Sequence, residues 1–196
     1  MSKLDNPYQD VDFDSPIFEQ ISDSPEIVFA QEFIKVSGKF VYCSDDNEFV
    51  EMLQSVMTEN NWESIHCLDQ RLSEPLNQKG IKTTHDEDNF DTMKVGLTRC
   101  EFLIARLGSI MVSSAHASGR RMNAFPEVHL VYARVSQLLP DLKDALKAIK
   151  EKYGQDLPSM ISLITGPSRT ADIEKTLVMG AHGPKELYVF LVDDQA

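Results

Sequence analysis

Short apolar runs alternate with helix-patterned segments along this chain, and that alternation constrains the fold most strongly. Apolar residues at helical spacing cover 25–37 and 45–61, whereas 39–44 and 62–69 are short runs typical of strands. Pro25, after Ser24, marks the start of the first helix, and Gly38 marks its end. This order predicts strand–helix–strand crossovers and therefore a parallel sheet.

The second half of the chain continues the pattern. The runs EFLIARL and SIMVSS are separated by Gly108 and predict two successive strands. VHLVYAR at 128–134 predicts a strand, the segment from Pro140 to Gly154 a helix, and ELYVFLVD the last strand. MISLITG is almost continuously apolar, which predicts a strand covered on both faces.

These elements favour an α/β three-layer sandwich with a mostly parallel sheet. Residues 70–91 are polar and predict only a short strand near 80–84. We expect 25–196 to form a single domain. Residues 1–24 have little apolar periodicity and many acids, so they are expected to be a poorly ordered or loosely docked arm, or alternatively a contact for a partner subunit.

Charge and cysteine content exclude several classes of protein. The formal net charge of −12 argues against a nucleic-acid partner, because such binding requires clustered Lys and Arg. Cys43, Cys67 and Cys100 stand far apart and form no metal-binding motif, so we expect buried, reduced thiols and neither a metal nor a cofactor. No apolar run is long enough to span a bilayer, and a cytoplasmic protein is expected.

Ligands of open parallel sheets bind beyond the carboxyl ends of the strands, which directs attention to the loops after Ser114, Arg134 and Ile164. The third loop begins ITGPSRTADIE. Its exposed amides, two hydroxyls and a guanidinium suit a carboxylate or phosphate. The candidate anion-binding residues here are Gly166, Ser168, Arg169, Thr170 and Asp172. The alternative is that a hydroxyl caps a turn while Arg169 pairs with a neighbouring acid.

Two further segments could contribute to the same pocket. In MGAHGP, Gly183 allows close approach of a ligand, and His182 could act as an acid or base; a structural histidine is the alternative. Arg120 and Arg121 in SGRR could share an anion with Arg169, or lie in solvent. The chain has no GxSxG, P-loop, GxGxxG or HExxH motif.

The stretch from Thr165 to Glu174, followed by Gly180, His182, Gly183 and Pro184, closely resembles the C-terminal signature of the LUD-domain family. The resemblance extends upstream to about Phe29. It implies a fold like that of the glucosamine-phosphate deaminase, ribose-phosphate isomerase and CoA-transferase superfamily. It also implies a role in oxidising L-lactate to pyruvate, as the component without iron–sulfur clusters of a system whose partner proteins carry them.

The chain departs from that family at one position. Many members have an acid in an A-E-T-G-T segment, where this sequence has Arg106. A covalent carboxylate mechanism inferred from the related transferases therefore loses its residue. Two other functions remain open: an isomerase or transferase acting on a phosphorylated or CoA-linked molecule, and a non-catalytic interaction subunit.

Overall fold

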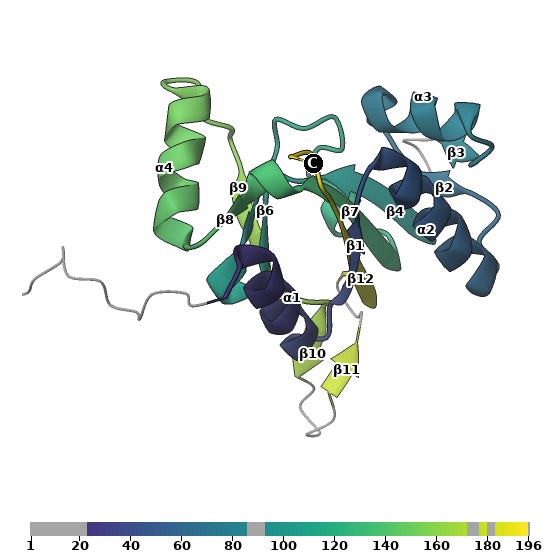
Figure 1. The fold of residues 1–196 in the computed structure, drawn as a ribbon, viewed down its shortest axis with the longest axis horizontal. Helices are drawn as coiled ribbons and strands as arrows, with labels where there is room; N and C mark the ends of the chain where they lie inside the picture. Colours follow the sequence, from purple (N-terminus) through teal and green to yellow (C-terminus); the bar gives the residue numbers. More distant parts are fainter. Residues whose placement is uncertain (1–22, 86–92, 172–176, 180–182, 196) are drawn as a thin grey trace, which may run out of the picture.

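The computed structural model describes residues 23–85, 93–171, 177–179 and 183–195, and it has the predicted α/β architecture (Figure 1). Among these residues, six strands form a sheet in which every paired neighbour runs parallel. In spatial order they are β1 (Lys39–Cys43), β12 (Glu186–Val192), β7 (Val128–Arg134), β4 (Val95–Arg99), β2 (Ile65–His66) and β3 (Thr83–Thr84).

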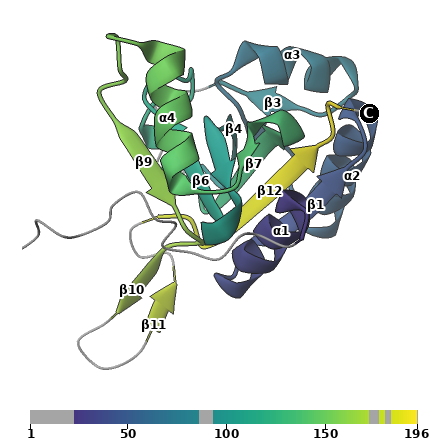
Figure 2. The same ribbon diagram turned by 60° about the vertical axis from the view of Figure 1, so that its left-hand side comes forward.

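A second sheet lies beside the first and was not predicted. In spatial order it consists of β8 (Leu138–Leu139), β5 (Phe102–Ile104), β6 (Ser109–Ser113) and β9 (Ile161–Ile164). β6 runs antiparallel to both of its neighbours. β10 (Arg169–Ala171) and β11 (Leu177–Met179) pair as a ribbon that projects away from the two sheets (Figure 2).

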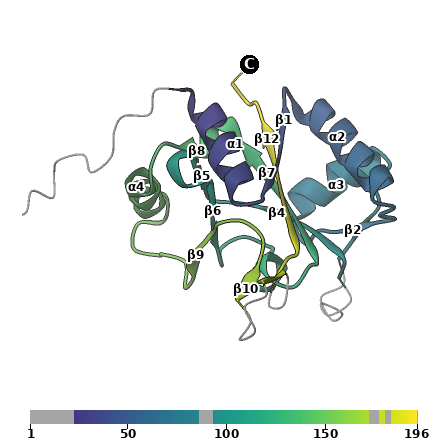
Figure 3. The same ribbon diagram turned by 90° about the horizontal axis from the view of Figure 1, so that it is seen from below.

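Helices cover the parallel sheet on both faces, which confirms the three-layer prediction. α2 (Asp46–Glu59) and α3 (Gln70–Gln78) lie on one face, and α1 (Pro25–Lys35) lies with the second sheet on the other (Figure 3). α4 (Leu142–Tyr153) packs outside the second sheet. The two resulting cores include Leu53, Leu97 and Phe190 on the first face and Phe33 and Val189 on the second.

α3 was not predicted, because its sequence carries little apolar signal. Asp69 caps the helix by accepting a hydrogen bond from the Arg71 amide at 3.0 Å. Only Leu72, Ser73 and Leu76 are buried, so the helix presents a narrow apolar stripe. β4 was also missed, since its residues run directly into those of β5.

The prediction for β9 was wrong in one respect. Ile161 and Leu163 are 37% and 39% exposed, because β9 is the edge strand of the second sheet and is not covered on both faces. It also runs antiparallel to β6, and the turn that follows it lies at the amino edge of the parallel sheet, where Ser168 N donates to Pro184 O just before β12 begins. Periodicity does not reveal strand direction.

The three cysteines are free and buried, as predicted. Burial raises the pKa of each thiol to about 12, so they remain protonated and unreactive near neutral pH. None of the helices in the described part of the chain is long and apolar enough to cross a membrane.

Gly108 provides a test of how the second sheet packs on α1. It has φ +54° and ψ +39°, and an added Cβ would lie 2.5 Å from the carbonyl carbon of Glu32. Gly119 has a similar φ of +59° with open space around it. We expect Gly108→Ala to cost about 3 kcal/mol, and Gly119→Ala about 1 kcal/mol, because only the first adds a clash to the left-handed strain. Equal losses of unfolding free energy for the two variants, measured by urea denaturation, would contradict this packing.

Candidate functional site

A cavity of about 490 Å³ opens at the carboxyl edge of the parallel sheet, between that edge and α2 and α3. Arg99 and Cys100 line it at the end of β4, and Tyr132 and Arg134 line it at the end of β7. The helices supply an apolar wall, which includes Phe49, Val50, Leu72, Pro75 and Leu76. This is the position at which open parallel sheets bind ligands.

The cavity carries a surplus of positive charge in an acidic chain. Five Lys and Arg side chains and one histidine line it, against the single acid Asp46; these basic residues are Arg71, Lys79, Arg99, Arg134, Lys152 and His116. A low-dielectric cleft lined by one sign of charge concentrates ions of the opposite sign. The cavity is therefore suited to an anion.

Acids at the border of the cavity hold several of these cations in place. Asp69 accepts from Arg99 Nε at 2.6 Å, and Asp46 accepts from Arg134 at 3.1 Å. A guanidinium has five N–H donors, so each arginine keeps donors for a ligand after making such a pair. The pairing fixes the direction of the side chains before a ligand arrives.

Behind the cavity, Glu101 is a fully buried carboxylate at the point where the chain passes from β4 to β5. Its Oε1 accepts hydrogen bonds from the Ser113 hydroxyl and, at 2.8 Å, from the Tyr153 hydroxyl. Its Oε2 lies 2.7 Å from Lys152 Nζ. His116 Nε2 lies 3.1 Å from Oε1. These four partners come from β6, the loop that follows it, and the end of α4.

Burial alone would raise the pKa of Glu101, because it disfavours the charged form. The interactions with His116, Lys152, Ser113 and Tyr153 outweigh burial and hold the pKa well below its ordinary value. Glu101 is therefore ionised throughout the neutral range. Since His116 and Lys152 also line the cavity, this buried charge orients two of the groups that face a ligand.

The predicted residues after Ile164 lie at the opposite edge of the sheet. Ser168 N donates to Pro184 O at 2.8 Å, two residues before β12 begins. Gly166 has φ +80° and packs against Val36, and an added Cβ on Gly183 would lie 3.0 Å from Ser168 Cβ. Gly183 and the turn at Ser168 are thus packed together, away from the carboxyl edge.

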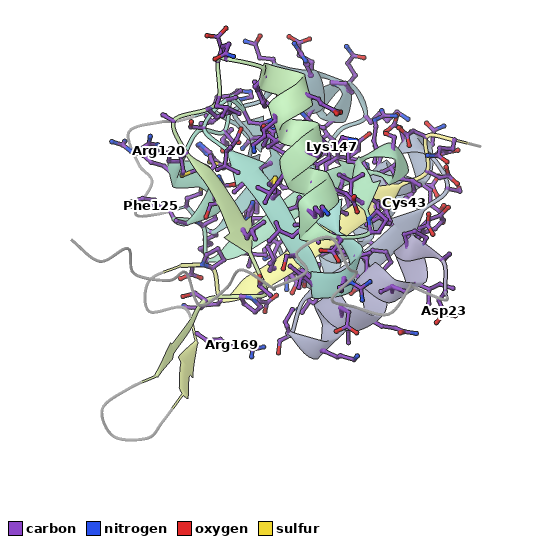
Figure 4. The ribbon with its side chains drawn as sticks, turned by 90° about the vertical axis from the view of Figure 1, so that its left-hand side faces the viewer. Asp23, Cys43, Arg120, Phe125, Lys147 and Arg169 are labelled. Atoms are coloured by element: carbon purple, nitrogen blue, oxygen red, sulfur yellow. The ribbon has the colours of Figure 1, made fainter. Side chains whose placement is uncertain are left out.

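Arg169 and the SGRR arginines have partners of their own. A terminal nitrogen of Arg169 donates to Val36 O at 2.7 Å and to Ser37 Oγ at 2.9 Å, which fastens the turn to the end of α1. Arg120 donates to Ser159 Oγ at 2.9 Å, and Arg121 is exposed at the start of a 3₁₀ turn. Figure 4 shows Arg120 and Arg169 well separated, so the structure does not bring them together.

The remaining residues that the sequence singled out are Thr170, Asp172, His182 and Arg106. Thr170 lies in β10, whereas Asp172 and His182 lie outside the described residues. Arg106 donates from Nε to Asp141 at 2.9 Å and so joins the β5–β6 connection to the start of α4. It does not line the cavity at the carboxyl edge.

Sequence reasoning missed Glu101 and Lys152, although it drew attention to the loops after Ser114 and Arg134. Glu101 opens an apolar run and has no sequence neighbour that marks it as buried. Had β4 been predicted, the rule that ligands bind at carboxyl ends would have pointed to Arg99. Among the described residues, no group of three or more His, Cys, Asp or Glu side chains is arranged to hold a metal ion.

The structure is that of an α/β protein with a cation-lined cavity at the carboxyl edge of its parallel sheet, and sequence comparison identifies its family. The LUD domain family matches residues 28–192. Lactate utilization protein C 1 of Bacillus mycoides (strain KBAB4) is 28% identical over 198 residues, covering 91% of this chain and 84% of that protein. The uncharacterized protein YkgG of Escherichia coli (strain K12) is 35% identical over 103 residues, covering 52% and 45%.

A solved structure supports the same assignment of the fold. The crystal structure of a DUF162 family protein from Deinococcus radiodurans matches with a TM-score of 0.64 at 16% identity, covering 86% of this chain and 96% of that one. The chain belongs to the LUD domain family.

The Glu101 network predicts a stability that depends on pH. Glu101→Gln should cost about 1–3 kcal/mol at pH 7, since it removes the charged acceptor of the hydrogen bonds from Ser113, Tyr153 and Lys152. Because the folded-state pKa is lowered, the stabilisation is present above the unfolded pKa of about 4.3 and is lost as pH falls towards the folded pKa. The difference in unfolding free energy between wild type and variant, measured by urea denaturation, should therefore begin to shrink below about pH 4 and continue to shrink as the pH falls. If the difference in unfolding free energy between wild type and variant were as large at pH 3 as at pH 7, the charge of Glu101 would not stabilise the fold.

Proposed function

We propose that the chain is the component without iron–sulfur clusters of a system that oxidises L-lactate to pyruvate, and that the cavity at the carboxyl edge binds the carboxylate of such an acid. The names of the related lactate utilization C proteins support the choice of system. The surplus of cations lining one cavity, in a chain of net charge −12, is the observation that carries the choice of site.

The geometry of the cations supports a carboxylate in particular. Arg134 and Arg99 stand at the ends of neighbouring strands β7 and β4, and both are held by acids at their border. A guanidinium can donate two parallel hydrogen bonds to a carboxylate, which fixes its orientation as well as its position. The apolar wall on α2 and α3 would then contact the carbon end of the ligand.

Oxidation of L-lactate removes two electrons, which a redox partner would receive. The resemblance to LUD-domain systems implies iron–sulfur proteins in that role, and we include them in the proposal. Association with such proteins can be measured by co-purification of the tagged chain from its native cells, followed by determination of iron and acid-labile sulfide.

A second candidate function is favoured by the size of the cavity. A volume of about 490 Å³ exceeds what a three-carbon acid fills, and it lies within the range of pockets for larger ligands. A phosphorylated or CoA-linked molecule would place its phosphate on the same arginines and its organic part on the apolar wall. Tight binding of a sugar phosphate or acyl-CoA, with none of lactate or pyruvate, would favour this alternative.

Charge-neutralising variants should locate the anion. Arg134→Gln should weaken pyruvate binding by about tenfold in calorimetry, since it removes a charge-assisted hydrogen bond. Lys147→Gln removes a positive charge from the exposed face of α4 and should leave binding unchanged. The test also separates the two candidate sites, because Arg169→Gln should have no effect. Loss of binding in Arg169→Gln alone would instead place the ligand at the turn of residues 165–169.

A further inference from the structure

Lys79 lines the cavity and is held there by a neutral partner. Arg99, Arg134 and Lys152 each form a salt bridge with an acid. Lys79 Nζ instead donates a hydrogen bond to the side-chain amide oxygen of Asn47. Because Asn47 carries no charge, it holds the side chain of Lys79 without cancelling its positive charge. An ammonium group has three N–H donors, so two of them remain for a ligand.

The start of α2 holds Lys79 close to Arg134. Asp46 accepts a hydrogen bond from Arg134 at 3.1 Å, and Asn47, the next residue, accepts from Lys79. Consecutive Cα atoms lie about 3.8 Å apart, so neighbouring positions on one helix fix the two cations. Both cations line the cavity. A ligand with one acidic group on Arg134 can therefore place a second acidic group, a few carbons further on, beside Lys79.

The helices beside these cations supply apolar contacts for a carbon chain. Lys79 directly follows the last residue of α3, and Leu72 and Leu76 of that helix line the cavity together with Phe49 of α2. These side chains can contact the carbon atoms of a ligand but not its charges. The volume of about 490 Å³ also leaves room beyond a three-carbon acid. The cavity thus combines more than one cation with an apolar wall.

We propose that Lys79 forms a second anion subsite of the cavity and that the acids bound most tightly there are dicarboxylates. One carboxylate contacts Arg99 and Arg134 at the strand ends, and the carbon chain lies on the apolar wall. The second carboxylate accepts a hydrogen bond from Lys79. Pyruvate and lactate fill the first position only. The inference rests on the proposed function, because it requires a carboxylate to bind in this cavity, and it names the class of acid.

Calorimetry with matched pairs of acids tests this subsite. The diacids 2-oxoglutarate and 2-oxoadipate are titrated into the full chain at pH 7, with pyruvate as the reference. Their partners are 2-oxopentanoate and 2-oxohexanoate, in which a methyl group replaces the second carboxylate. At least one diacid should bind about fivefold more tightly than its partner, as expected for a charge pair at an exposed lysine. Lys79→Gln should abolish this advantage and leave the affinity of the monoacids unchanged, whereas Lys79→Arg should retain the advantage.

Lys82→Gln is the matched control, because it removes the same charge from an exposed lysine that does not line this cavity; it should retain the advantage. Equal affinities of diacid and monoacid in both pairs, or binding of pyruvate alone, overturn the inference and leave the proposed function standing. An advantage that persists in Lys79→Gln, or that Lys82→Gln removes as well, has the same meaning. Failure of pyruvate and of all four longer acids to bind overturns the proposed function as well.

Discussion

The arrangement of the elements around the cavity depends on how the buried negative charge of Glu101 is compensated. Glu101 lies where the chain leaves the parallel sheet, and its partners come from three other parts of the chain. A carboxylate removed from water is costly unless it is paired and hydrogen-bonded. The end of α4, the end of β6 and the loop with His116 must therefore converge on it. That convergence sets the position of two groups that face the cavity.

The cavity gathers positively charged side chains in a chain that is acidic as a whole. Asp69 holds the side chain of Arg99, and Asp46 holds that of Arg134. Because these side chains are ordered in advance, a ligand would lose little free energy by ordering them when it binds. The charge outside the cavity repels anions at long range, but screening limits this effect to about 8 Å at physiological salt. At short range, the attraction of an anion to the cations that line the cavity outweighs this repulsion.

The sequence predicted the alternation of helices and strands, the parallel sheet and the layers on its faces, because these follow from periodicities that each segment carries within itself. It did not predict the second sheet or α3, whose signals are short or polar. The direction of β9 decides at which edge the Thr165 turn lies, and no local pattern encodes direction. The partners of Glu101 lie up to 52 residues away, so its role became visible only in three dimensions.

The central claim is that a small carboxylate binds at the carboxyl edge of the sheet, on the cations that Glu101, Asp69 and Asp46 hold in place. A crystal structure of the chain with oxamate, an unreactive analogue of pyruvate, tests it most directly. The account predicts density for oxamate within hydrogen-bonding distance of Arg134 or Arg99. Density beside Arg169 and Gly183, with the cavity at the carboxyl edge empty, would contradict it.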